Sequence, residues 1–342
     1  MKVLYAIQGT GNGHIARARE LVPILKKQVD ADILISGIQS EVNLGIPEDY
    51  RLSGMGFIIG KGGGVDFLNT FKKCLTRKFI TEVRGFPIEK YDLVINDFEP
   101  VSAWAARLKG IPCISMSHQY AVIHGNTPKP DKKDWMGKLV LANYAPVQKG
   151  YGFHFQSYSP NIFTPVIRKE VRNLKVKNGD HITVYLPAYD NDRIIKVLSD
   201  FKEENWQVFS KHCPRPFRFN NISFQPIENQ KFLQSMASSK GILCGAGFET
   251  PAEALFMGKS LMVIPMKNQY EQQCNAAALQ NMGIPVIKSL KKKHSPQIED
   301  WLQNQMPIRI SYPDQSSELI SKILKDSENL PKPKPLSTIG LF

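Results

Sequence analysis

The stretch Cys244–Leu279, CGAGFETPAEALFMGKSLMVIPMKNQYEQQCNAAAL, decides the fold. The apolar run Gly241–Cys244 leads into it, three small residues follow, and apolar residues then recur at helical spacing. This predicted helix ends at Gly258, and a second apolar run, Ser260–Ile264, predicts another strand. The order strand, glycine turn, helix, strand is typical of an open α/β sheet, which binds ligands at the carboxyl ends of its strands.

The glycine turn has the features of an anion site. Gly245 and Gly247 allow the backbone to come close to a ligand. The free amides that open the next helix, Phe248 to Thr250, suit a phosphate because the helix dipole lies behind them. The Thr250 hydroxyl adds a further hydrogen-bonding group.

Carboxylates follow this turn at two places. Glu253 lies one turn into the helix, where it can accept hydrogen bonds from both hydroxyls of a ribose. The loop after Ser260–Ile264 closes with Glu271 and Gln272, which we expect at the carboxyl end of that strand. Each feature alone has a simpler explanation, because glycine turns and solvated helix carboxylates are common. Their combination in one stretch favours a ligand site.

The motif Gly247-x-x-Thr250-x-x-Glu253, followed by Glu271-Gln272, resembles the donor-binding signature of nucleotide-sugar glycosyltransferases of the GT-B fold. The similarity is closest to the branch that contains the peptidoglycan N-acetylglucosaminyltransferase and the diglyceride glycosyltransferases. It implies that Gly247 and Thr250 hold a diphosphate, Glu253 holds the ribose, and Glu271 with Gln272 reads the transferred sugar. It also implies two Rossmann-like, doubly wound parallel-sheet domains that face each other across a cleft.

The length of 342 residues exceeds the usual size of one domain, so two α/β domains are expected. We predict an N-terminal acceptor-side domain at 1–165, a linker at 166–178, a C-terminal nucleotide-sugar domain at 179–328 and a flexible tail at 329–342. In the second domain, the resemblance places the backbone around Ile227 beside the nucleotide base.

The composition is that of a globular protein, with 42% hydrophobic and 22% charged residues. The net charge of +13 favours an anionic partner. We expect no nucleic acid in that role, because the sequence has no helix-turn-helix, zinc-finger or aromatic-basic pattern. The five cysteines match neither a zinc site nor a disulfide framework, so we expect reduced core thiols and no bound metal.

A second glycine-rich turn follows the first apolar run, Lys2–Ile7, and opens a predicted helix at His14. Its glycines do not fit the dinucleotide fingerprint. The GT-B resemblance includes a similar loop, which puts Gly11 and Gly13 at the donor and makes the histidine the base that deprotonates the acceptor. A helix N-terminus favours the neutral imidazole that this role needs, although a histidine here can also simply cap the helix. Arg17 on the same helix either meets phosphate or is solvated.

Polar residues end two further predicted strands. Asp97 and Glu99 follow the run Tyr91–Ile95, and His118 and Gln119 follow the next apolar run. We expect these four side chains on the acceptor side of the cleft, with Asp97 and His118 as further catalytic candidates. Each could instead cap the helix or loop beside it. Together with the first glycine turn, these segments also resemble a little-characterised microbial glycosyltransferase-like family, which leaves the acceptor undefined.

The segment Phe67–Phe79 predicts a basic amphipathic helix, which suits anionic lipid headgroups, although a core-facing helix gives the same apolar stripe. No apolar run is long enough to span a bilayer, and the first one lacks the features of a signal peptide. We therefore expect a cytoplasmic protein, which contacts the inner face of the membrane if this helix binds lipid.

The resemblance implies an inverting, metal-independent glycosyltransferase that needs no cofactor. We expect it to move a sugar from a nucleotide-diphosphate donor, a UDP-sugar, to a hydroxyl of a lipid-linked or cell-envelope glycan. A nucleotide-sugar 2-epimerase is one alternative, because His118, Asp97 and Glu99 could supply acid and base groups. A sensor that binds sugar nucleotides without catalysis is the other.

Overall fold

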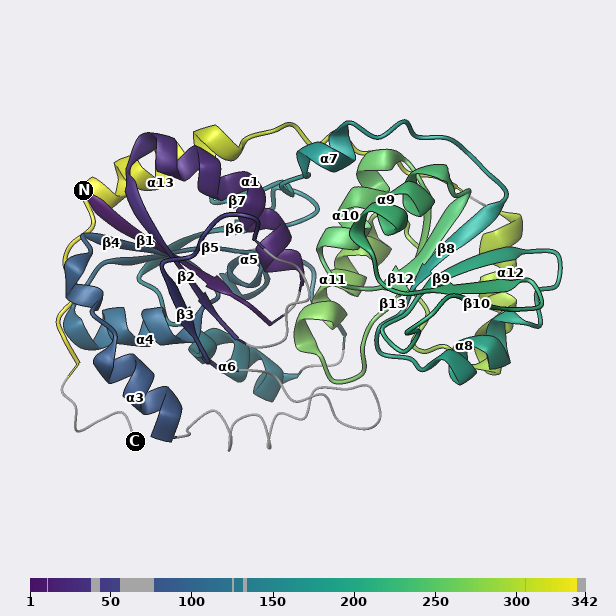
Figure 1. Cartoon of the computed structure of the whole chain (residues 1–342), viewed down its shortest axis with the longest axis horizontal. Coiled ribbons are helices and arrows are strands. Elements are labelled where there is room, and N and C mark those ends of the chain that lie inside the picture. Colours follow the sequence, from purple (N-terminus) through teal and green to yellow (C-terminus); the bar gives the residue numbers. More distant parts are fainter. Residues whose placement is uncertain are drawn as a thin grey trace.

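The computed structural model describes residues 1–10, 12–37, 44–55, 77–124, 126–131, 134–304 and 306–336. These residues form two α/β lobes that lie side by side along the long axis of the molecule (Figure 1). Gly11 and most of the predicted helix Phe67–Phe79 lie outside the described residues.

The first lobe contains a seven-stranded sheet in the order β3-β2-β1-β4-β5-β6-β7, in which all neighbouring strands are parallel. The strands are β1 (Lys2–Gln8), β2 (Asp30–Ser36), β3 (Tyr50–Leu52), β4 (Leu93–Asp97), β5 (Cys113–Ser117), β6 (Lys149–Phe153) and β7 (Ile162–Phe163). The central strands β4 and β5 are buried along their whole length. This burial explains their nearly continuous apolar sequences, because helices cover both faces of such a sheet.

The second lobe contains a six-stranded sheet in the order β10-β11-β9-β8-β12-β13. Its strands are β8 (His181–Tyr185), β9 (Asn205–Phe209), β10 (Phe217–Phe219), β11 (Ile222–Gln225), β12 (Gly241–Gly245) and β13 (Ser260–Ile264). Only the edge pair β10–β11 is antiparallel among the described strands of this sheet. The stretch that decides the fold forms β12, a helix and β13, as its glycine and apolar pattern predicts.

The helices cover both sheets. Those of the first lobe are α1 (Asn12–Gln28), α3 (Arg77–Gly85), α4 (Pro100–Lys109), α5 (His118–His124) and α6 (Trp135–Tyr144), with a 3-10 turn η1 (Ile88–Lys90). After the short α7 (Lys169–Arg172), the second lobe has α8 (Asn191–Leu198), α9 (Asn229–Ser238), α10 (Glu249–Met257), α11 (Tyr270–Asn281), η2 (Lys292–His294) and α12 (Ser295–Gln303).

The last helix, α13 (Ser316–Glu328), packs on α1 of the first lobe (Figure 1), although the predicted boundaries assign it to the second domain. The reason is its apolar face, because Leu319, Ile320 and Ile323 are fully buried or nearly so. The chain then runs on along the first lobe, where the Gln148 side chain donates to the Pro331 carbonyl at 3.0 Å. Residues 331–336 of the predicted flexible tail are thus extended against this lobe, and 337–342 lie outside the described residues.

The order of the strands determines where ligands can bind. In the first sheet, β1 lies between β2 and β4, so the connections on its two sides run in opposite directions. The second sheet has the same arrangement, with β8 between β9 and β12. Such switch points leave a crevice at the carboxyl ends of the strands. Figure 1 shows α10 and α11 of the second lobe facing the first lobe at this level.

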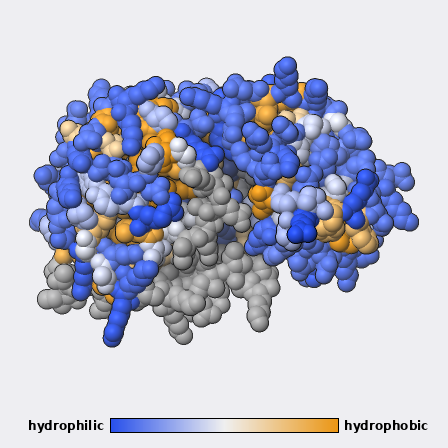
Figure 2. Space-filling model, in the orientation of Figure 1, coloured by the Kyte–Doolittle hydropathy of each residue, from blue (hydrophilic) through white to orange (hydrophobic). Residues whose placement is uncertain are grey.

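On the face shown in Figure 2, the described surface is mainly hydrophilic, and its hydrophobic residues form small separate groups. Within the described ranges, no helix combines the length and the hydropathy needed to cross a bilayer. The membrane contact expected for Phe67–Phe79 stays a prediction, because only residues 77–79 of that segment are described, as the start of α3.

Candidate active site

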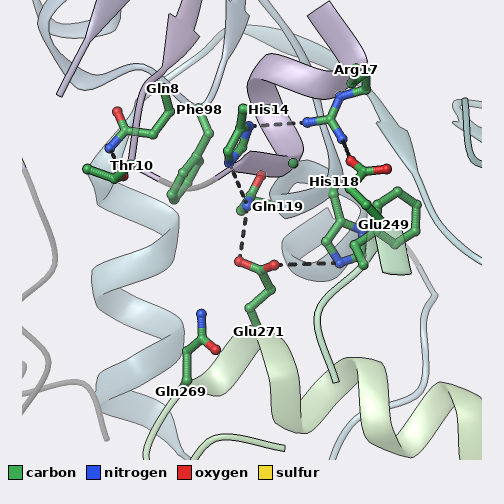
Figure 3. A pocket seen from close by; sticks show the side chains of 12 residues that line it. Gln8, Thr10, His14, Arg17, Phe98, His118, Gln119, Glu249, Gln269 and Glu271 are labelled. Atoms are coloured by element: carbon green, nitrogen blue, oxygen red, sulfur yellow. Dashed lines mark hydrogen bonds and ion pairs between the residues drawn. The ribbon is translucent and has the colours of Figure 1, made fainter. Parts of the chain in front are cut away.

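A cavity of about 200 Å³ lies between the lobes. It is lined by residues that follow strands of both sheets (Figure 3): Gln8, Thr10, Gly13, His14, Arg17, Phe98, His118, Gln119, Phe248, Glu249, Gln269 and Glu271. The two glycine turns meet here, because a Cβ atom on Gly13 would lie only 2.9 Å from Cγ of Glu249. A larger residue at position 13 would therefore require the Glu249 side chain to shift.

His14, in the first turn of α1, has one ring nitrogen bound to a buried carboxylate. Nδ1 lies 2.8 Å from Oδ1 of Asp97, and Asp97 is fully buried. Nδ1 also lies 3.2 Å from Arg17, but that guanidinium already donates to both Asp97 oxygens. A carboxylate can only accept, so Nδ1 carries the proton and donates it to Asp97. In the neutral ring, Nε2 then carries the lone pair, which accepts only a long hydrogen bond, 3.4 Å, from the Gln119 amide.

Arg17, one turn along α1, connects Asp97 to the second lobe. Its guanidinium lies 2.8 Å and 2.9 Å from the two oxygens of Asp97, and its Nη1 donates to Glu249 of α10 at 2.5 Å. Burial alone would raise the pKa of Asp97, but the charges of Arg17 and His14 outweigh burial and hold the pKa below its ordinary value. Asp97 is therefore an anion, as the hydrogen bond from His14 requires.

For Glu249, burial outweighs the charge of Arg17, so its pKa is raised and not lowered. Burial raises its pKa from the usual 4.5 to about 7, and the nearby charge of Glu253 acts in the same direction, although Arg17 opposes the rise. The carboxyl group therefore exchanges its proton near neutral pH. A charge-assisted hydrogen bond between the lobes depends on this group, which suggests that pH affects how firmly the lobes are joined.

Gln119 lies between His14 and Glu271 (Figure 3). Its Nε2 donates to Oε2 of Glu271 at 3.0 Å and lies 3.4 Å from Nε2 of His14. Glu271, in the first turn of α11, is thereby brought from the second lobe to the predicted acceptor side. Gln119 and Glu271, which the sequence places on opposite sides of the cleft, therefore line one cavity.

His118 also lines the cavity, but the protein occupies both of its ring nitrogens. Nδ1 lies 2.8 Å from the Phe153 carbonyl, and Nε2 lies 2.8 Å from Oδ1 of Asn275. The ring stacks on Phe248 with centroids 3.9 Å apart, and burial lowers its pKa despite the nearby charge of Glu271. This geometry suits a contact between the lobes and leaves no ring nitrogen for proton transfer to a substrate.

Glu99, expected on the acceptor side, does not line the cavity. Its carboxylate is the N-cap of α4, where it accepts from the amides of Val101 at 2.8 Å and Ser102 at 2.6 Å. Ser36 donates a third hydrogen bond to it at 2.6 Å. The capping explanation therefore holds for Glu99, because the free amides at the start of α4 bind its carboxylate.

Glu253, the expected ribose contact, is paired within the protein. Arg168, which precedes α7 in the linker region, donates from Nε to Oε1 at 2.7 Å and from Nη2 to Oε2 at 2.9 Å. Glu253 is 3% exposed, so its carboxylate needs such a partner. Gln272, the expected sugar contact, instead accepts from the Met266 amide at 2.9 Å and does not line the cavity.

The other predicted donor residues lie around the start of α10 and after the carboxyl end of β11. No atom lies within 4 Å of where a Cβ of Gly247 would be, and Gly245 has its nearest neighbour at 3.8 Å. Phe248 is the N-cap of α10 and makes no side-chain cap, and Thr250 lies in the first turn of that helix. Ile227 is half-buried in the loop between β11 and α9.

Several residues that line the cavity were not predicted from the sequence. Gln8 ends β1, Thr10 follows it, Gln269 precedes α11, and Phe98 follows Asp97 with a left-handed backbone (φ 59°). Such a φ in a bulky residue marks strain, which is common at functional sites. No local sequence pattern predicts the left-handed backbone at Phe98. Within the described parts of the chain, no three His, Cys, Asp or Glu side chains are arranged to hold a metal ion.

Comparisons with known proteins identify the fold and the family of the chain. None of the curated protein sequences compared with the chain matches it. Several solved structures share its fold at low identity. The glycosyltransferase SnogD from Streptomyces nogalater has 13% identity and a TM-score of 0.53, covering 98% of this chain and 96% of SnogD. Phytolacca americana UGT2, solved with UDP-2fluoro-glucose and pterostilbene, has 12% identity and a TM-score of 0.55, covering 96% and 94%.

A UDP-N-acetylglucosamine 2-epimerase has 14% identity and a TM-score of 0.56, covering 98% of this chain and 99% of the epimerase. At these identities the likeness shows the fold, which is GT-B with two parallel-sheet domains. The family model described as "Glycosyl transferase family 1" matches residues 1–307, most of the chain and both lobes. The chain therefore belongs to glycosyl transferase family 1 and is a glycosyltransferase.

Proposed function

We propose that this glycosyltransferase inverts the anomeric centre of a UDP-sugar and that His14 is the base that activates a hydroxyl acceptor. The main support is the arrangement of His14 and Asp97, in which the 2.8 Å hydrogen bond puts the lone pair of the ring on Nε2, where an acceptor hydroxyl would replace the long 3.4 Å hydrogen bond from Gln119. His14 lines the cavity, and its side chain remains 12% exposed while Asp97 is fully buried. A base needs this combination of an accessible lone pair and a buried partner that fixes the tautomer.

The reaction would proceed by a single displacement. The acceptor oxygen forms a bond to the anomeric carbon, the bond from that carbon to the donor's phosphate oxygen breaks, and the nucleoside diphosphate leaves with its electron pair. The acceptor's proton moves to Nε2 of His14 and later to solvent. Asp97 stabilises the imidazolium that forms, and Arg17 keeps Asp97 ionised.

The proposed donor site is the glycine turn and the first turn of α10. Open space at Gly247 admits a diphosphate, and the free amides of the helix can stabilise its charge without a metal ion. Glu253 remains the proposed ribose contact, because each oxygen that Arg168 occupies keeps a second lone pair. Glu271 is the proposed sugar contact.

The test is a comparison of His14→Ala with His212→Ala, whose exposed ring lies outside the cavity in the second lobe. A thermal-shift panel of nucleotides and nucleotide sugars first identifies the donor, since a saturating ligand stabilises the folded state. His14→Ala should bind this donor normally and lose transfer by at least about 100-fold. His212→Ala should keep both properties. Unchanged turnover in His14→Ala would remove His14 from the mechanism, and NMR of the product would show whether the anomeric centre inverts.

The epimerase alternative has the fold likeness in its favour. Two of its candidate acid and base groups are enclosed by protein, because Asp97 binds Arg17 and Glu99 caps α4. Incubation with UDP-N-acetylglucosamine alone separates the two reactions, since an epimerase converts it without an acceptor. The proposed lipid-linked or cell-envelope acceptor rests on the resemblance of the donor motif. The proposed location at the inner face of the membrane depends on the segment Phe67–Phe79, and vesicle binding by a variant with neutral residues there tests it.

A further inference from the structure

Glu249 lies where the two lobes meet and where the proposed site of the donor's diphosphate begins. It is the first residue of α10 after the N-cap, and it follows the open turn at Gly247 by two residues. The free amides of this first helical turn favour negative charge. A carboxylate in the same turn would compete with a phosphate group for that position. The charge state of Glu249 therefore matters for binding of the diphosphate.

The first lobe binds one of the two carboxyl oxygens of Glu249 and leaves the other without a partner (Figure 3). Oε1 accepts from Nη1 of Arg17 at 2.5 Å, and Cγ packs against Gly13. Within the described parts of the chain, Oε2 has no hydrogen-bond partner, and it is not among the buried atoms that are closed off from solvent. The side chain lines the cavity and is 20% exposed. Oε2 is thus the oxygen that a bound ligand can reach.

The titratable and charged groups around Glu249 leave it without a cation of its own. They come from several elements: Tyr5 of β1, His14 and Arg17 of α1, Asp97 of β4, Glu253 of α10, and Arg168 before α7. Arg17 already binds both oxygens of Asp97, and Arg168 binds both oxygens of Glu253. The charges of these two pairs largely cancel, and burial raises the pKa of Glu249 to about 7. In the free protein, this carboxyl group is therefore near the midpoint of its titration at neutral pH.

A bound diphosphate would favour the protonated form further. It brings at least two negative charges to the start of α10, and like charges a few ångströms apart raise the pKa of a carboxyl group. An ionised Glu249 would also place an acceptor opposite the phosphate oxygens, whereas a carboxylic acid has a hydroxyl that donates to them. Such a hydrogen bond to an anion is stronger than one between neutral groups. Protonation therefore removes the repulsion and adds a contact.

From these observations we propose that Glu249 binds the diphosphate of the sugar donor as a neutral carboxylic acid, with the proton on Oε2 and with Oε1 still bound to Arg17. Above neutral pH the protein takes up one proton from solvent for each donor molecule that binds. It returns this proton when the nucleoside diphosphate leaves. The proposal rests on the proposed function, because it requires a diphosphate at α10, and it adds the residue and the proton.

The pH dependence of nucleotide binding follows from the direction of this shift. Below about pH 7 the group is largely protonated in the free protein, so binding takes up little. As the pH rises further, the free protein loses the proton and the complex keeps it, so the affinity falls by at most about tenfold per pH unit. Glutamine has the shape of the neutral acid, with an oxygen for Arg17 and an NH₂ group that donates to phosphate. Glu249→Gln should therefore bind equally well across this range.

The experiment is calorimetry of the full-length protein with UDP, TDP, GDP and ADP, which share the diphosphate and differ in the base. Titrations at pH 8 in buffers of different ionisation enthalpy, HEPES and Tris, give the number of protons taken up. The terminal phosphate is already ionised at this pH, so the nucleotide itself releases no proton. For the nucleotide that binds, wild type should take up at least about half a proton, and its affinity should fall about five- to tenfold from pH 7 to pH 8.5.

Three variants assign the proton to its residue. Glu249→Gln should show neither the proton uptake nor the fall in affinity. Glu299→Gln, on the exposed face of α12, is the matched control and should behave as wild type does. His14→Ala should keep the uptake, because the proposal places the proton on Glu249 and not on the neighbouring imidazole.

The outcomes separate this inference from the proposed function. A nucleotide that binds wild type at pH 8 without proton uptake overturns the inference and leaves the transferase mechanism intact, whether or not any variant folds. Uptake that persists in Glu249→Gln, or that disappears in His14→Ala, assigns the proton to another group and also overturns it. Failure of all four nucleotides to bind would refute the proposed donor site itself, and the inference with it.

Discussion

Replacing Glu249 with glutamine should change how the stability of the protein depends on pH. The Glu249 carboxyl group bridges the lobes through Arg17, and burial raises its pKa from 4.5 to about 7. Glutamine keeps an oxygen that accepts from Arg17 and removes the titration. The change therefore isolates the cost of ionising this group in the folded protein.

The sign follows from the raised pKa. Below pH 4.5 the group is protonated in both the folded and the unfolded state, and its stabilising contribution is fully present. Between pH 4.5 and about 7 the folded protein holds the proton and the unfolded chain does not, so this contribution is lost as the pH rises. The rise in pKa corresponds to about 3 kcal/mol, and this is an upper estimate because the side chain is 20% exposed.

The assay is denaturant unfolding of the wild type and of Glu249→Gln from pH 5 to pH 8. The variant should gain up to about 3 kcal/mol relative to the wild type across this range. Glu299→Gln, on the exposed face of α12, is the control and should give a constant difference. A difference between wild type and Glu249→Gln that does not change with pH would show that the buried carboxyl group is not held as the geometry indicates.

Three further changes test neighbouring contacts. Asp97→Asn removes the negative charge that pairs with Arg17, so the free energy of unfolding should fall by about 3 kcal/mol. It also no longer fixes the tautomer of His14, so kcat should fall about 10³- to 10⁴-fold. Near-normal single-turnover rates would contradict this. Gly13→Ala places a Cβ 2.9 Å from Cγ of Glu249, so the Glu249 side chain must shift and its hydrogen bond to Arg17 should weaken. Transfer should then slow at least about tenfold, and an unchanged rate would count against the close contact. Lys259 donates to two backbone carbonyls, and burial lowers its pKa to about 8. Its folded pKa lies below the unfolded value of 10.5, so wild type should gain stability over Lys259→Met as the pH rises from 8 to 10, and a flat or opposite trend in thermal unfolding would refute this.

Local sequence patterns predicted the scaffold of the site well. The runs Lys2–Ile7 and Ser260–Ile264 form the strands β1 and β13, and small residues occupy the turns that meet at the cavity. These features depend on the spacing of neighbouring residues, which a single sequence shows directly. For the same reason His14 could be placed at the start of a helix.

The partners of the charged groups could not be predicted in this way. Arg168 and Glu253 are 85 residues apart, and Arg17 and Glu249 are 232 apart. Nothing local in the sequence shows which of two distant side chains will meet. The sequence therefore indicated a ribose contact for Glu253 but not the hydrogen bonds that Arg168 donates to its carboxylate.

The path of the chain constrains how the two lobes can move. The polypeptide passes from the first lobe to the second between β7 and β8, and it passes back between α12 and α13. Two covalent connections restrict the motion of one lobe relative to the other more than a single linker would.

The return crossing also means that the first lobe is built from two separate pieces of the polypeptide, whereas the second lobe, from β8 to α12, is continuous. The similarity to the family ends at residue 307, yet Ile320 and Ile323 beyond it belong to the same hydrophobic cluster as Leu21 and Leu25 of α1. A fragment that stops at that residue would expose the part of the apolar face of α1 that α13 covers, so the first lobe completes its packing only after α13 has been synthesised.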